Sequence, residues 1–392
     1  MLSLFLSKAS FPSKSVQALR EVLSQEPLQR IFASLSRRLV SLSSSNEAPV
    51  REAVSSLLHL LQSEEVRDTV LTVSDPSLVA LCRDLISGLS ATVQHASIEV
   101  AVTAVCVFAC VCQNEKARQL LLQHSDTEPI FQAIPRLLAE VGSDSATAKT
   151  VTPSVAYLTR YPSAQRRVLA SGRSAKLLAG LGSLMRSADS KTASDAAGAL
   201  GNLTYSDGGR YQVLAHKDLD EVVGGLSLIL EGPEELAGNA AWAIGNLCRD
   251  EAWCDKMLDR PKWVKDVILG ASKLLSSADH QTATDAGSVL AFVCATSKGQ
   301  ECVLEHAEAE GIMRVLLDNL CSADQNVSVT AAWAVKRLRE GKRGEEAFAA
   351  AVKGKSEAVR GTIKEVQKSL DMSSEKTSST AAAASIAVRG LL

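Results

Sequence analysis

The stretch that decides the fold runs from Asn239 to Leu247 and reads Asn-Ala-Ala-Trp-Ala-Ile-Gly-Asn-Leu. Two other stretches repeat its pattern: residues 195–203 read Asp-Ala-Ala-Gly-Ala-Leu-Gly-Asn-Leu, and residues 330–338 read Thr-Ala-Ala-Trp-Ala-Val-Lys-Arg-Leu. Each is rich in alanine and carries apolar residues at the spacing of a helix face, without the alternation of a strand. The three stretches therefore predict helices of one kind, used repeatedly in the core.

Similar helices recur along most of the chain. Their anchor residues follow one another at steps of 47, 45, 44, 46 and 45. In chain order the anchors are Cys110, Tyr157, Asn202, Asn246, Phe292 and Arg337. His59 extends the series upstream less regularly, by 51 residues. A repeat of about 45 residues is typical of α-solenoids, in which each unit buries its apolar faces against its neighbours.

Two further landmarks keep register with the anchors. An aspartate precedes the anchor by 13 residues in four units, and a proline takes that place in a fifth. These residues are Asp144, Asp189, Asp279, Asp324 and Pro233. Both residue types are typical of a helix start, where an Asp side chain accepts hydrogen bonds from free backbone N–H groups. A histidine follows the anchor by 14 residues at His124, His216 and His306, where a place at a helix C-terminus is favoured over metal binding.

Between these positions, the sequence of each unit predicts a short helix, a second helix and a longer third helix. In one unit we expect them over residues 208–215, 219–230 and 234–248. We expect the third helices to centre near the anchor residues. Residues from about 50 to 368 should be almost wholly helical, with no sheet.

Residues 239–247 resemble the third helix of an armadillo repeat, and residues 195–203 and 330–338 are close relatives of it. The resemblance is specific from about residue 98 to 340. It implies an all-α fold, a right-handed α-solenoid of about six to seven three-helix repeats. HEAT repeats, with two helices per unit, are the near alternative. In the armadillo family the third helices line a groove that holds extended peptides. The resemblance thus implies a partner-binding groove lined by Tyr157, Asn202, Trp242, Asn246, Phe292, Trp333 and Arg337.

The importin-alpha branch of the family places an asparagine four residues after a tryptophan, so that both side chains share one helix face. This chain has the full pair once, at Trp242 and Asn246. Elsewhere it departs from the pattern, as Trp333 with Arg337 shows. These departures argue against a nuclear-import adaptor but leave the general role of partner binding, which depends on the groove.

Each groove residue also has a structural interpretation. Trp242 and Trp333 either anchor a ligand or fill the seam between repeats. Asn202 and Asn246 either bind a ligand backbone or satisfy a carbonyl at a neighbouring helix end. The basic cluster at residues 336–343 either meets an acidic partner or forms a solvated helix end.

Composition excludes several classes of function. A net charge of −2 and a pI near 6.3 supply no basic field for nucleic acid. The nine cysteines are irregularly spaced, which predicts reduced core thiols and no metal site. No catalytic or cofactor motif occurs, and no apolar stretch reaches the roughly 18–20 residues of a membrane span. With 46% hydrophobic and 4% aromatic residues, the core is expected to consist of Ala, Leu, Val and Ile.

The ends of the chain differ from the repeats. We expect residues 1–50 to form capping helices or a targeting segment, 51–345 the repeat array, 346–370 a C-terminal capping helix and 371–392 a disordered tail rich in Ser and Ala. Met1–Arg20 has basic and serine residues but no acid, so it resembles a mitochondrial or plastid transit peptide. A first capping helix is the alternative.

Together these features predict a protein-binding scaffold or adaptor that uses either the concave groove or the ridges of the repeat array, that is not an enzyme and that works without a cofactor. Its expected partner is a protein or an extended peptide segment within a hetero-complex, and neither nucleic acid nor membrane insertion is expected. The expected location is cytoplasmic, with mitochondria as the alternative. A second hypothesis is an architectural subunit of a large complex, which could be mitochondrial.

Overall fold

The computed structural model describes residues 25–353 except 43–46, 72–74, 144, 171–172, 218 and 307–308, together with 355, 357, 360–361 and 364. The chain divides into two compact units, unit 1 with residues 1–203 and unit 2 with residues 204–392. Each unit is described by itself. Met1–Arg20 and the tail at 371–392 lie outside the described residues, so the expectations for both remain predictions.

Unit 1 contains helices in a recurring order of lengths. They are α3 (Gln25–Leu42), α4 (Glu47–Gln62), α5 (Glu64–Leu71), α6 (Asp75–Thr92), α7 (Ile98–Val111), α8 (Glu115–Gln123), the 3-10 turn η1 (Ser125–Thr127), α9 (Glu128–Glu140), α10 (Ala146–Leu158), α11 (Pro162–Val168) and α12 (Ser174–Leu184). The last helix, α13 (Ser190–Tyr205), ends just past the boundary. From α5 onward, a short helix, a second helix and a third helix follow one another three times.

Unit 2 continues the same order. Its helices are α14 (Asp207–Leu214), α15 (Leu219–Leu230), α16 (Glu234–Cys248), α17 (Glu251–Leu258), α18 (Pro261–Leu274), α19 (His280–Val293), α20 (Ser297–Glu305), α21 (Ala309–Asn319), α22 (Gln325–Leu338) and α23 (Lys342–Lys353). The bounds of α15 and α16 are those expected from the sequence, and α14 both begins and ends one residue earlier than expected. No strand occurs among the described residues, so the all-α prediction is confirmed.

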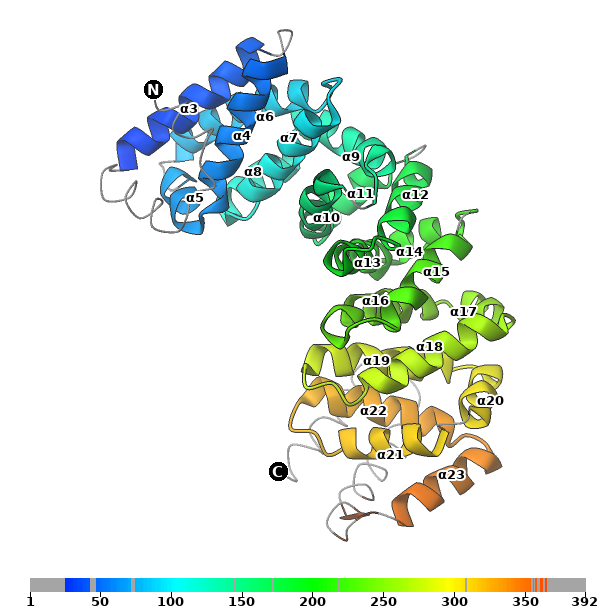
Figure 1. The fold of residues 1–392 in the computed structure, drawn as a ribbon. Helices are drawn as coiled ribbons and strands as arrows, with labels where there is room; N and C mark the ends of the chain where they lie inside the picture. Colours follow the sequence, from blue (N-terminus) through cyan, green and yellow to red (C-terminus); the bar gives the residue numbers. More distant parts are fainter. Residues whose placement is uncertain are drawn as a thin grey trace. The chain divides into compact units, whose positions relative to one another are not determined.

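The helices of each unit pack in two layers (Figure 1). In unit 2, the third helices α16, α19 and α22 lie in series, and the second helix α15 packs on α18. In unit 1, α7 packs between α4 and α10, while α3 packs on α6 and α9 on α12. Helix α4, which carries His59, therefore takes the place of a third helix, with α3 as its second helix.

The core between the layers consists mainly of Ala, Leu, Val and Ile, as the composition predicts. Phe32, Phe108 and Phe131 are the fully buried aromatic side chains of the described residues, and the rings of Phe108 and Phe131 meet edge to face at 5.6 Å. Small core side chains let adjacent helices approach closely.

Glycines mark the closest approaches between second helices. A Cβ atom on Gly180 of α12 would lie 2.7 Å from the backbone carbon of Leu138 in α9. In the other unit, a Cβ on Gly270 of α18 would lie 2.8 Å from Leu230 Cβ in α15. A larger residue would push each pair of helices apart.

The third helices begin at the predicted capping residues but do not centre on the anchors. Asp189, Asp279 and Asp324 accept backbone N–H bonds at the starts of their helices, and Pro233 holds the N-cap position of α16. Ser145 caps α10, because its side chain accepts a bond from Ala148 N, and Asp144 lies outside the described residues. A helix that starts right after the cap and runs about 14 residues puts a residue 13 positions after the cap in its last turn. Our expectation that the anchors mark helix centres was therefore wrong.

The helical capping bonds should contribute measurably to stability. Asp279 Oδ2 accepts bonds from the backbone N of Thr282 at 2.9 Å and from its hydroxyl at 2.6 Å. We expect Asp279→Ala to lower the free energy of unfolding by about 1 kcal/mol, because it leaves the first turn of α19 without a side-chain acceptor. Denaturant unfolding measures this, with Asp279→Asn as the control that keeps an acceptor. Equal losses in both variants would contradict a capping role.

Candidate partner-binding surface

The C-terminal ends of the third helices are held by a device that recurs along the chain. A side chain on the following short helix donates a hydrogen bond to the carbonyl six residues before it. The donor and acceptor pairs are Arg67 and Leu61, Arg118 and Cys112, Gln165 and Thr159, Arg210 and Thr204, and Gln300 and Cys294. These bonds satisfy carbonyls that the helix itself leaves free.

Sequence reasoning missed these donors, although a signal was present. The donors follow the repeat, with steps of 51, 47 and 45 residues between the first four and 90 residues to the last. Within that gap, Asp255 occupies the equivalent position, and a carboxylate accepts hydrogen bonds but does not donate them. Arg and Gln at one register would have indicated the device, since both donate to carbonyl oxygens.

In unit 2, the predicted surface residues lie on three third helices packed in series. Trp242 and Asn246 belong to α16, Phe292 to α19, and Trp333 and Arg337 to α22. Trp333 is 41% exposed, whereas Trp242, Phe292 and Arg337 are half-buried and Asn246 is 6% exposed. We call the three aromatic residues among the more exposed ones, Trp242, Phe292 and Trp333, the aromatic ladder. Arg337 is the fourth of the more exposed residues. The structure thus brings these side chains onto one layer of unit 2.

In unit 1, the equivalent residues make bonds to the preceding repeat. Asn202 Nδ2 donates to the carbonyl of Ala156 at 2.8 Å and to Thr159 Oγ1 at 3.2 Å. Tyr157 donates from its hydroxyl to the carbonyl of Cys112 at 3.0 Å. The amide of Asn202 therefore satisfies a neighbouring helix end, which is the structural alternative that the sequence left open. A ligand would have to replace these bonds to reach it.

The basic cluster at the end of α22 is compensated by carboxylates of the chain. Arg337 Nη1 lies 3.2 Å from Glu340 Oε1, and Arg339 Nη2 lies 2.8 Å from Glu345 Oε1. Arg343 in α23 forms a further ion pair at 3.1 Å with Glu305 of α20. Local compensation reduces the attraction for an acidic partner, so the geometry favours a solvated helix end over an acidic docking site here.

A buried carboxyl lies on the middle helix of the ladder. Asp285 of α19 is 8% exposed and accepts a hydrogen bond at 3.1 Å from Gln281 Nε2. Burial raises the pKa of Asp285 from 3.8 to about 7, a shift that the Gln281 bond opposes and the charge of Asp279 assists. Near neutral pH this carboxyl therefore exchanges between a hydrogen-bond donor and a charged acceptor.

Other chemically active residue types occupy structural positions. All nine cysteines are free thiols, and burial raises the pKa of Cys82 to about 11 and that of Cys106 to about 12, which makes both weak nucleophiles. His124 and His306 are the C-cap residues of α8 and α20. Among the described residues no group of His, Cys, Asp and Glu gathers as metal ligands would, and no helix is long and apolar enough to cross a membrane.

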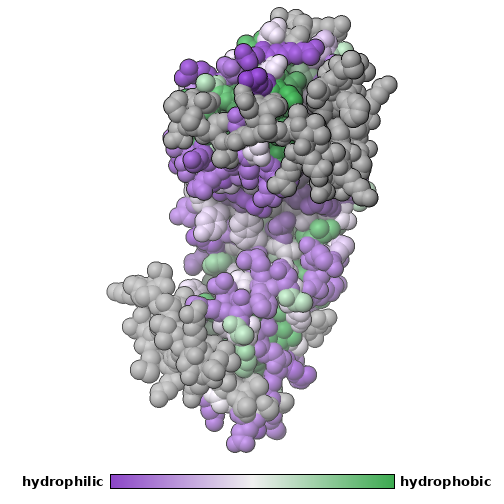
Figure 2. Space-filling model, turned by 90° about the vertical axis from the view of Figure 1, so that its left-hand side faces the viewer, coloured by the Kyte–Doolittle hydropathy of each residue, from purple (hydrophilic) through white to green (hydrophobic). Residues whose placement is uncertain are grey.

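One face of the described part of the chain is mostly polar. Figure 2 shows that the described part of one face is largely hydrophilic, with hydrophobic residues in small separate areas. In such a setting a large exposed aromatic side chain acts as a single anchor and not as part of a broad apolar patch.

Known structures share this fold, although no protein-family model and no curated protein matches the chain. An engineered protein from the Northeast Structural Genomics Consortium is similar over 99% of this chain and 93% of its own, with a TM-score of 0.62 and 19% sequence identity. A designed armadillo repeat protein covers 77% of this chain and 99% of its own, with a TM-score of 0.42 and 17% identity. Another, solved with the peptide (KR)4, covers 68% of this chain and 96% of its own, with a TM-score of 0.40 and 18% identity.

The helix triplets form an armadillo-like helical repeat fold, and the likeness to the engineered protein shows that this fold occurs in a known structure. The short, second and third helices recur in the order that the resemblance implies. The HEAT alternative, with two helices in each unit, does not fit the short helices α8, α11, α14, α17 and α20.

The hydrogen bonds of Asn202 predict a structural cost for its removal. We expect Asn202→Ala to lower the free energy of unfolding by about 1 kcal/mol, because the part-buried carbonyl of Ala156 loses one of its two side-chain donors and keeps only the Thr159 hydroxyl, at 3.0 Å. Asn202→Asp keeps the size but not the donor and should cost at least as much. Denaturant unfolding of both variants tests this, and a loss near zero would show that these bonds contribute nothing.

The buried carboxyl of Asp285 predicts a dependence of stability on pH. Burial of the ionised Asp285 carboxylate lowers the free energy of unfolding, because the pKa of Asp285 is higher in the folded state than in the unfolded state. This loss of stability is absent below about pH 4, grows as the pH rises and is complete above about pH 7. We expect Asp285→Asn to raise the free energy of unfolding at about pH 8, by at most a few kcal/mol, and to leave it nearly unchanged at about pH 4. Chemical unfolding across this range measures the effect. An equal change at both pH values would contradict it.

Proposed function

We propose that this chain is a protein-binding scaffold whose third-helix layer holds an extended segment of a partner. The observation that supports this most directly is Trp333, a tryptophan 41% exposed in the third-helix layer, in register with half-buried Trp242. Exposing so large an apolar side chain to water costs free energy, and a partner that covers it recovers that energy. Tryptophan is also the residue type most enriched among the side chains that dominate binding.

The spacing of the ladder suits an extended ligand. Helices packed side by side lie about 8–10 Å apart. An extended chain rises about 3.3 Å per residue, so two or three ligand residues would span one repeat. Trp242, Phe292 and Trp333 would then each meet a different ligand side chain.

The polar residues of the surface have a smaller part in this proposal than the sequence implied. Asn246 is 6% exposed, and Arg337 already forms an ion pair with Glu340. Apolar contact with the aromatic rings would therefore supply most of the affinity. The proposed ligand is one with aliphatic or aromatic side chains in this stretch.

We further propose that the scaffold is an adaptor in the cytoplasm, working within a hetero-complex. The alternative is an architectural subunit of a larger complex, including one in mitochondria if Met1–Arg20 acts as a transit peptide. In the alternative, fixed contacts would lie on the second-helix layer. Leu228 of α15, which is 54% exposed, is the residue there that such a contact would cover.

Two matched variants separate these surfaces. Peptides selected by display on the purified chain provide ligands, and their affinities are then measured by calorimetry. We expect Trp333→Ala to weaken the selected peptides by about 2 kcal/mol or more, because it removes the exposed anchor. Its melting temperature should change little, since the side chain is not part of the core.

The control is Leu228→Ala, which removes a comparably exposed apolar side chain from the second-helix layer of the same unit. It should leave the affinity of the selected peptides within about twofold of the original, which is under 0.5 kcal/mol. Loss of binding in Leu228→Ala with retention in Trp333→Ala would refute the third-helix surface and favour the architectural alternative.

A further inference from the structure

A second surface, in unit 1, joins two tyrosines and two arginines. It consists of Arg118 from α8, Tyr157 in the last turn of α10, Arg160 two residues after that helix, and Tyr161 at the N-cap of α11. We call it the Tyr–Arg cluster. The Arg118 guanidinium carbon lies 4.6 Å from the centre of the Tyr161 ring, and that of Arg160 lies 5.7 Å from the centre of the Tyr157 ring. The two rings meet edge to face at 5.6 Å.

The hydroxyl groups of the cluster are already used within the chain. Tyr161 donates to the Tyr157 hydroxyl at 2.8 Å, and Tyr157 donates to the carbonyl of Cys112 at 3.0 Å. Arg118 donates to the same carbonyl at 3.3 Å. These bonds hold the rings and the Arg118 side chain in place before any ligand arrives, which lowers the entropic cost of binding.

The tyrosines do not neutralise the arginines. Burial, together with the Tyr161 hydrogen bond and charge, raises the pKa of Tyr157 to about 12, although Arg118 opposes the shift. Tyr157 is therefore uncharged at physiological pH. Two positive charges face two neutral rings.

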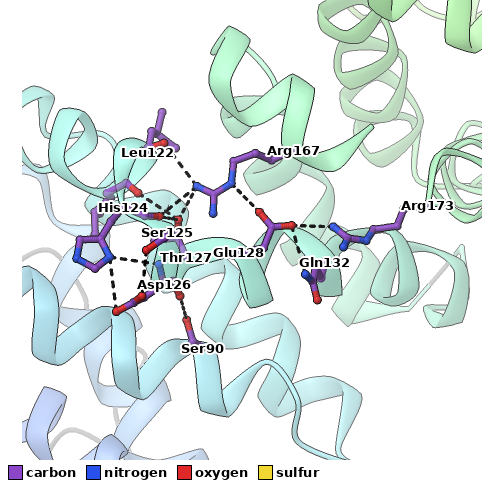
Figure 3. Close-up of polar contacts among 11 residues, drawn as sticks. Ser90, Leu122, His124, Ser125, Asp126, Thr127, Glu128, Gln132, Arg167 and Arg173 are labelled. Carbon is purple, nitrogen blue, oxygen red and sulfur yellow. Dashed lines mark hydrogen bonds and ion pairs between the residues drawn. The ribbon is translucent and has the colours of Figure 1, made fainter. Parts of the chain in front are cut away.

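Other arginines of unit 1, in contrast, have their charge compensated by a carboxylate. Figure 3 shows Arg167 and Arg173 on the carboxylate of Glu128, at 3.0 and 2.9 Å. Burial works to raise the pKa of Glu128, but the bonds from Arg173, Arg167 and Gln132 outweigh it and hold the pKa below the ordinary value. Such a carboxylate leaves those guanidinium groups little attraction for a ligand.

Within the described part of unit 1, no carboxylate comes within ion-pair distance of Arg118 or Arg160. Two carboxylates attract these arginines only at longer range: Glu115 attracts Arg118, and Asp195 attracts Arg160. Arg160 is exposed, and the other three residues are half-buried. The cluster is thus preorganised and cationic, and it is built from the residue types that dominate protein interfaces.

We propose that the Tyr–Arg cluster is a docking site for an acidic peptide segment of a partner protein. Carboxylates would bind the free N–H groups of the guanidinium planes, and the ligand's aliphatic or aromatic carbons would cover the tyrosine rings. An acidic protein segment fits better than nucleic acid, because two arginines on a chain of net charge −2 cannot follow a phosphate backbone. The inference rests on the proposed function only in that both describe a scaffold, since the aromatic ladder belongs to the other unit.

The test uses the full chain and a fluorescently labelled poly-glutamate peptide, with binding followed by anisotropy. We expect the chain to bind this peptide, and Arg160→Gln to weaken binding about tenfold, since a charged anchor is lost. The matched control is Arg166→Gln, which removes the same charge from an exposed position on α11 that has no tyrosine ring beneath it. It should change the affinity less than about twofold, as expected for a rim charge.

Two further probes define the outcomes. Poly-lysine should bind far more weakly than poly-glutamate, and a labelled oligothymidylate should bind no better than poly-glutamate. Tighter binding of the oligonucleotide, with the same loss in Arg160→Gln, would overturn the proposal in favour of a nucleic-acid site. Absence of poly-glutamate binding, or equal losses in both arginine variants, would overturn it too, while leaving the Trp333 result and the scaffold function unaffected.

Discussion

A third helix inside the stack has to bury apolar side chains against the third helices on both of its sides, and the other features of the fold follow from this constraint. In α19, which packs between α16 and α22, Ala286, Val289 and Leu290 are fully buried. A single helix triplet would leave such side chains in water, at a cost of roughly 25 cal/mol per Å² of apolar surface. Stacking removes this cost, and the small residues of the core permit the close spacing that stacking needs.

Close stacking in turn places helix ends in partly buried surroundings, where free carbonyl and N–H groups are costly. The chain meets this with capping aspartates at the helix starts and with Arg or Gln donors six residues beyond the helix ends. Asn202 and Tyr157 add bonds from one repeat to the one before. Polar residues in the last turn of a third helix can therefore be occupied by hydrogen bonds within the stack, as Asn202 and Tyr157 are.

The side chains that packing and hydrogen bonding within the stack leave wholly or partly exposed differ between the two units. Unit 2 presents the exposed Trp333 together with the half-buried rings of Trp242 and Phe292 on its third helices, and the nearby Arg337 is compensated by Glu340. Unit 1 presents the guanidinium groups of the Tyr–Arg cluster over neutral rings. The same helical framework thus offers an apolar surface in one unit and a cationic one in the other, which suits ligand segments of different chemistry.

The sequence by itself determined the features that depend on short-range interactions. The helical type, the repeat of about 45 residues, the bounds of α15 and α16 and the capping aspartates all follow from local periodicity and from bonds between residues three apart. The prediction that the third helices centre on the anchor residues used the repeat spacing without the capping residues, and it was wrong. The capping residue sets where a helix starts, and this puts the anchor in the last turn.

Only the tertiary structure decided which equivalent positions stay exposed and which are bonded within the stack. Asn202 and Tyr157 share the register of Arg337, yet the first two are bonded to carbonyls of the preceding repeat and the third pairs with a nearby glutamate. Trp333 and Trp242 also share a register but differ in exposure. The physical reason is that a side chain's exposure and bonds depend on atoms contributed by residues roughly one repeat, or about 45 positions, away in sequence, where local pattern carries no information.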